Sequence, residues 1–195
     1  MRGKALFIGV VAAVLAAGPA FAHTQAGVAG GFFSGFSHPI LGWDHVVAMV
    51  AVGLWGAFLG APANWMLPVV FPLVMALGGA LGVLGVPVPA VEAGIAASAV
   101  VLGLLIALAV RLPLAAAGAI VAAFAIFHGH AHGTELPEAA NPFAYAVGFV
   151  IATGLLHICG ITLGLLARWP AGALAVRAGG GAICAAGLAF LFGLV

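Results

Sequence analysis

The sequence predicts an all-α fold, a polytopic bundle of about six transmembrane helices that follows a cleavable signal peptide. Composition is the first reason: of 195 residues, 66% are hydrophobic and 5% are charged. About a quarter of the residues of a soluble domain are charged, so this chain lacks the usual polar shell. Five Lys and Arg residues, two Cys residues and thirty Gly residues without a fixed period exclude a nucleic-acid binder, a disulfide scaffold and a solenoid.

Residues 1–22 have the pattern of a secretory signal peptide. Two basic residues precede a short apolar segment, residues 5–17, and residues 20–22 (Ala-Phe-Ala) supply a cleavage pattern of small residues. The apolar segment is shorter than the roughly 20 residues that a span needs, which favours cleavage over an uncleaved first helix. Cleavage would make His23 the mature N-terminus, where its amine and its imidazole can chelate one metal ion together.

The mature chain, residues 23–195, divides into apolar stretches long enough to cross the hydrocarbon core of a membrane. Helices are expected at these lengths because backbone groups in lipid must form hydrogen bonds within their own segment. The expected spans are residues 39–60, 65–85, 90–110, 112–130, 141–167 and 171–194. The longest connection, residues 131–140, lies between the fourth and the fifth span.

The distribution of positive charge predicts the orientation. The basic residues of the mature chain are Arg111, Arg168 and Arg177. A count of spans from an N-terminus outside the membrane places all three on the cytoplasmic side, as the positive-inside rule expects. The expected location is therefore the bacterial inner membrane, with the mature N-terminus in the periplasm.

Most ionisable side chains of the mature chain then fall in one layer at the outer leaflet, when depth is taken from the helical rise of about 1.5 Å per residue. The members of this layer are His23, His38, Asp44, His45, Glu92, His128, His130, His132 and Glu135. Polar groups in a span are costly, so they usually face one another or a wet cavity. Imidazoles and carboxylates without a thiolate cluster suit a divalent first-row metal ion.

The first expected span carries the most specific segment, in which His38 is followed by Asp44 and His45. On a straight helix the two histidines share a face but lie about 10 Å apart along the axis, so one ion reaches both only if the helix breaks. Pro39 and Gly42 permit a break. Asp44 can be a ligand, or it can fix the tautomer of the adjacent imidazole. The alternative is a capped helix start, with Asp44 and His45 satisfied by neighbouring helices.

A second histidine cluster ends the fourth expected span. His128 and His132 are four residues apart and would share a helical face, whereas His130 would point elsewhere. The alternative is a His-rich turn exposed to water. Glu92, level with both clusters, is expected to be a ligand or a charge-balancing partner. His157, past the midplane, is either a second station on a path to the cytoplasm or a hydrogen-bonded packing residue.

The chain resembles the HupE/UreJ family of small bacterial membrane proteins. The resemblance rests on the pattern H-x5-D-H, here His38, Asp44 and His45, and on the pattern F-H-G-x-A-H-G-x-E in residues 127–135. His130 takes the variable position of the second pattern, so the resemblance gives it no role. The family is regarded as nickel/cobalt permeases, often linked to hydrogenase or urease maturation. The resemblance implies uptake of nickel or cobalt without choosing between them.

The sequence thus predicts a transporter that takes Ni²⁺ or Co²⁺ as its substrate and needs no prosthetic group. The expected metal ligands are His23, His38, Asp44, His45, Glu92, His128 and His132, with Glu135, His157 and His130 as accessory residues. The expected partners are the divalent ion and the lipid bilayer, not nucleic acid. The sequence is compatible with a homo-oligomer and does not decide whether one forms. Affinity is expected to fall as imidazoles protonate, near their ordinary pKa of about 6.5. Without a Walker A motif, the chain is not expected to hydrolyse ATP itself.

Two other functions use the same side chains. A membrane-embedded hydrolase would hold zinc with three histidines and use a carboxylate as general base, but it also needs a substrate cleft that water can reach. A haem-binding electron carrier would use His45 and either His128 or His157 as axial ligands. The transport hypothesis predicts no enzymatic activity.

Overall fold

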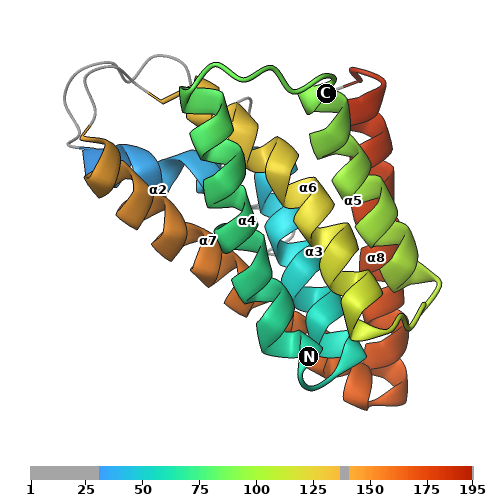
Figure 1. Cartoon of the computed structure of the whole chain (residues 1–195). Helices are drawn as coiled ribbons and strands as arrows, with labels where there is room; N and C mark the ends of the chain where they lie inside the picture. The colour runs from blue at the N-terminus through green and yellow to red at the C-terminus, as the bar shows by residue number, and fades with distance from the viewer. Residues whose placement is uncertain (1–30, 137–140, 195) are drawn as a thin grey trace.

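The computed structural model describes residues 31–136 and 141–194, and within these ranges the chain is helical without β-strands (Figure 1). The all-α prediction is therefore confirmed. The helices are α2 (Gly31–Leu41), α3 (Trp43–Leu59), α4 (Ala63–Val83), α5 (Val91–Ala107), α6 (Leu114–Thr134), α7 (Pro142–Gly164), the short 3-10 helix η1 (Leu165–Arg168) and α8 (Pro170–Leu191). The predicted signal peptide and His23 lie outside the described residues.

The six expected spans correspond to α3, α4, α5, α6, α7 and α8, though not all of them at full length. By length and composition, α4, α6, α7 with η1, and α8 can each cross a membrane. The first span is long enough only when α2 and α3 are taken together. α5 is apolar but has only 17 residues, so it is shorter than the other spans. Large apolar side chains remain on the outside of the bundle, for example Leu73 at 67% and Leu174 at 69% exposure. Such a surface suits lipid and not water.

The first expected span is not a straight helix. The chain leaves the helical conformation at Gly42 (φ −85°, ψ 107°), and α3 begins there at an angle of 79° to α2. α2 packs along α7, where Gly35 and Gly148 let the two backbones touch (Figure 1). The break that Pro39 and Gly42 permit is thus present, and α3 alone runs down the centre of the bundle.

Glycines also bring α6 against α4. A Cβ atom on Gly129 would collide with the carbonyl oxygen of Met75, and one on Gly133 would collide with that of Gly79. Residues four apart lie on one face of a helix, so this face of α6 packs directly against the backbone of α4. His128 and His132 each precede one of these glycines, which turns them roughly 100° around the helix.

Consecutive helices from α3 to α8 alternate in direction, so the helix ends form two opposite layers (Figure 1). One layer holds the arginines. The guanidinium of Arg177 donates a hydrogen bond to the carbonyl of Ala107 at the end of α5 (2.9 Å), and Arg111 lies 4.7 Å from the ring centre of Phe58. The other layer contains the beginning of α3 and the end of α6, where the first and second histidine patterns lie.

Candidate metal centre

Imidazoles from three helices meet at the end of the bundle opposite the arginines. We call His38 from α2, His45 from α3, and His128 and His132 from α6 the histidine cluster. The ring centroid of His132 lies 4.8 Å from that of His38 and 4.4 Å from that of His45, and His128 lies 5.1 Å from His45. His45, His128 and His132 are buried. The two histidine patterns, more than 80 residues apart in the sequence, therefore build one site.

The break at Gly42 shapes this cluster. It brings the ring centroids of His38 and His45 to 6.4 Å, whereas a straight helix would separate these residues by about 10 Å along its axis. A Cβ atom on Gly42 would lie 3.2 Å from both Asp44 Oδ1 and His45 Nδ1, a tight contact that glycine avoids. Broken helices also form the ion sites of many transporters.

Asp44 orients the imidazole of His45. The ring Nδ1–H donates a hydrogen bond to Asp44 Oδ1 (2.8 Å), which also accepts the backbone N–H of His45 (2.9 Å). A carboxylate only accepts hydrogen bonds, so Nδ1 carries the proton and Nε2 keeps its lone pair. Nε2 is buried and has no hydrogen-bond partner among the described residues. Neighbouring helices therefore leave His45 Nε2 unsatisfied, which does not support the alternative of a simple capped helix start.

The α6 histidines also present free ring nitrogens. His128 Nδ1–H donates to the carbonyl of Phe124 (3.0 Å), which leaves Nε2 buried without a partner. Both ring nitrogens of His132 are buried without a partner in the described part of the chain. Buried polar atoms are normally paired, so several unpaired imidazole nitrogens in one place are unusual. Neutral imidazole nitrogens with free lone pairs are good ligands for a divalent ion.

An acidic residue lies at the outer edge of the cluster. Glu135 Oε2 is 3.6 Å from His38 Nε2, and the Glu135 side chain is 43% exposed. One ligand atom from each of His38, His132 and Glu135 lies within 4.8 Å of the others, a grouping that could hold a metal ion. These three residues join the surface of the protein to the buried histidines.

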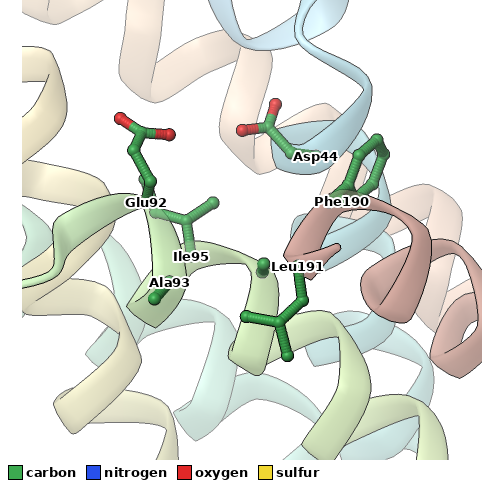
Figure 2. Close-up of a pocket in the computed structure, with 7 residues that line it drawn as sticks. Asp44, Glu92, Ala93, Ile95, Phe190 and Leu191 are labelled. Carbon is green, nitrogen blue, oxygen red and sulfur yellow. The ribbon is translucent and has the colours of Figure 1, made fainter. Parts of the chain in front are cut away.

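Glu92 borders a different space from Glu135. A pocket of about 450 Å³ lies between the beginnings of α3 and α5 and the end of α8, and Asp44, Glu92, Phe190 and Leu191 line it. Figure 2 shows the carboxylates of Asp44 and Glu92 on two different helices of this pocket. The structure thus places Glu92 in the wall of the same pocket as Asp44.

Comparison with known proteins shows the family of this chain. A match to the family described as HupE / UreJ protein covers residues 11–190. The chain belongs to the HupE/UreJ family. It is also 46% identical, over 176 residues, to Protein HupE of Rhizobium leguminosarum bv. viciae, a match that covers 90% of this chain and 92% of that protein. No solved structure matches the chain. Membership in HupE/UreJ supports a multi-pass membrane protein with a transporter role related to nickel or cobalt.

The second HupE/UreJ pattern lies on a continuous helix, since α6 runs through Thr134. The alternative of a His-rich turn in water is wrong, because His128, His130 and His132 are 0%, 8% and 6% exposed. His130 points away from the cluster, as expected, and its Nε2–H donates to the carbonyl of Val86 in the loop between α4 and α5 (2.8 Å). This hydrogen bond gives His130 a structural role outside the cluster.

Three aromatic residues of this HupE/UreJ site were missed by the sequence reasoning. On α7, the ring centroid of Phe149 is 4.3 Å from that of His132, and Tyr145 is 6.2 Å from His38. Tyr145 and Phe149 are four residues apart, and the same spacing continues through Thr153 to His157. This spacing on one helix face could have indicated the two aromatic residues. On α4, the ring of Phe71 is 5.4 Å from His128. Nothing in the sequence around Phe71 distinguishes it from an ordinary core residue.

Proposed function

We propose that the chain takes up Ni²⁺ or Co²⁺ across the bacterial inner membrane and binds the ion in the histidine cluster. One observation carries the proposal: imidazoles with unpaired nitrogens on α3 and α6 lie together in a buried site, with the ring centroid of His45 5.1 Å from that of His128 and 4.4 Å from that of His132. A membrane protein tolerates such groups where they bind a ligand or line an ion path. Membership in a transporter-type family supports transport over the hydrolase and the haem-binding alternatives.

The ion would enter in steps. His38, His132 and Glu135 lie outermost, so they would take the ion from the periplasm, together with His23 at the mature N-terminus. His45 and His128 would then receive it deeper in the bundle. Imidazole nitrogens would replace waters of the hydration shell one at a time, and several weak sites would let the ion move on. Asp44 and Glu92 would balance the two positive charges of the ion.

The orientation of the site in this proposal rests on charge. Arg111, Arg168 and Arg177 lie at the opposite end of the bundle from the histidine cluster, so the positive-inside rule places the cluster at the periplasm. A facilitator, an ion-coupled carrier and a subunit of a larger machine would all use the same binding site.

Uptake of radiolabelled metal tests the proposal directly. Cells that produce the protein are expected to accumulate labelled nickel or cobalt faster than cells without it, and the unlabelled form of either ion should compete. Competition by each metal against the other would also give the preference between them. Equal accumulation in both kinds of cell, for both metals, would contradict the proposal.

Replacement of Asp44 by Asn is expected to weaken metal binding by about 10–100-fold, the usual effect of losing a carboxylate that orients a histidine ligand. Asn keeps the size of the side chain but removes its charge and its strong acceptor for His45 Nδ1–H. Equilibrium dialysis of the purified protein with Co²⁺ would measure the change in Kd. An unchanged Kd would mean that Asp44 does not support His45 as a ligand.

A further inference from the structure

A second group of unpaired polar atoms lies deeper in the bundle, on α7. His157 is 2% exposed, and neither of its ring nitrogens has a hydrogen-bond partner among the described residues. Thr153 is fully buried, and its Oγ1 likewise has none. The two residues are four apart on one helix, so both side chains lie on the same face. The structure therefore does not support the alternative of a hydrogen-bonded packing histidine.

The unpaired hydroxyl of Thr153 is not a general property of hydroxyl residues in this bundle. Ser98, Thr134 and Thr162 each donate to a backbone carbonyl one turn earlier, at 2.6, 2.8 and 2.7 Å. Such local bonds are the usual way in which a helix satisfies a buried hydroxyl group. Thr153 Oγ1 instead has no partner among the described residues, one helical turn before His157, which leaves an oxygen and a nitrogen donor on one buried face of α7.

This second place lies further along the proposed path. Tyr145, next to His38, and His157 are separated by 12 residues of α7, or about 18 Å of helix. The ring of Phe71 contacts a histidine of each level, with its centroid 5.4 Å from that of His128 and 5.7 Å from that of His157. Gly53 lets the backbone of α3 touch the carbonyl of His157, which fixes the position of the α7 backbone here.

We propose that Thr153 and His157 form a second, inner binding station for the same divalent ion, connected to the histidine cluster through the Phe71 ring, which contacts a histidine of each. This inference rests on the proposed function. The station offers one borderline nitrogen ligand and one hydroxyl oxygen, so the ion keeps several waters there and binds more weakly than in the cluster. Weak binding suits an inner station because the ion must leave it toward the cytoplasm.

The test combines metal uptake with metal binding. His157→Gln keeps a polar side chain of similar reach but removes the imidazole ligand, and Thr153→Val removes only the hydroxyl. Both variants are expected to lower labelled nickel or cobalt uptake, by about tenfold or more for His157→Gln. The Kd for Co²⁺ at the histidine cluster, measured by dialysis of the purified protein, is expected to stay unchanged. Thr162→Val is the matched control, since Thr162 is exposed and bonds to its own helix.

Each outcome distinguishes the inner station from the proposed function. Uptake at the wild-type rate in His157→Gln and Thr153→Val would overturn the station. Loss of Co²⁺ binding in the same variants would also overturn it, because His157 would then support the fold of the outer site. If His157→Gln does not accumulate as folded protein, uptake by Thr153→Val decides. Normal uptake in a His45→Ala variant would overturn the histidine cluster as the binding site, and equal accumulation in cells with and without the protein would overturn the proposed function itself.

Discussion

Replacement of His45 by Ala is expected to abolish nickel and cobalt uptake while the protein still inserts into the membrane. His45 lies between His128 and His132, with ring centroids 5.1 and 4.4 Å away, so its loss removes the contact between the α3 and α6 ligands. The variant shortens a side chain that makes no hydrogen bond outside the Asp44–His45 pair among the described residues. Labelled-metal uptake and immunoblots of membrane fractions would measure the two expectations separately.

His130→Gln is the matched control for this prediction. His130 belongs to the same turn of α6 as His132 but donates to the carbonyl of Val86, and Gln keeps a donor for that bond. Uptake is expected to stay near the wild-type rate. Normal uptake in His45→Ala would mean that the ion does not pass through the histidine cluster. Equal losses of uptake in both variants would mean that any substitution at this end of the bundle disrupts the protein.

Gly129→Ala is expected to destabilise the folded bundle strongly. Its added methyl group would collide with the carbonyl oxygen of Met75, which belongs to helix backbone and cannot rotate away. Overpacking of a tight interior costs about 1–3 kcal/mol of unfolding free energy, and a clash with backbone belongs at the upper end of that range. The expected result is a lower Tm for the detergent-solubilised protein, together with a lower yield from membranes.

Gly118→Ala, on the same helix, controls for the substitution itself. A Cβ atom on Gly118 would meet nothing within 4 Å, and Ala is the better helix former by about 1 kcal/mol. Its Tm is therefore expected to equal or exceed that of the wild type. A Gly129→Ala variant as stable as Gly118→Ala would mean that α6 does not lie against α4 as closely as the structure shows.

Fold class and the layer of ionisable residues followed from the sequence, because both depend on quantities that a sequence carries. Mean hydropathy and the length of apolar stretches predict helices in lipid, and a fixed rise per residue gives each polar residue a depth. The pairing of the His45 and His128 regions followed from their shared depth. For Asp44 the sequence left two roles open, a metal ligand or a partner that fixes the His45 tautomer, and the structure shows the hydrogen bond that the second role requires.

Angles and lateral contacts did not follow from the sequence. Gly42 and Pro39 permitted a break, but the angle of 79° depends on how α2 packs against α7. The end of α6 lay four residues further on than the apolar pattern indicated, because buried histidines continue the helix where exposed ones would end it. The contact of Phe71 with both His128 and His157 depends on the packing of α4 against its neighbours, which no local pattern encodes.

The bend at Gly42 has a mechanical consequence for metal capture. At 79° to α3, α2 would run nearly parallel to the bilayer surface, and its exposed Phe33 and Leu41 would rest among the lipid headgroups. His38 belongs to α2, and His45 belongs to the spanning helix α3. The separation of the two rings is therefore set by the torsion angles of Gly42 together with the packing of α2 against α7, so a surface helix and a spanning helix at a fixed angle form the entrance to the candidate site.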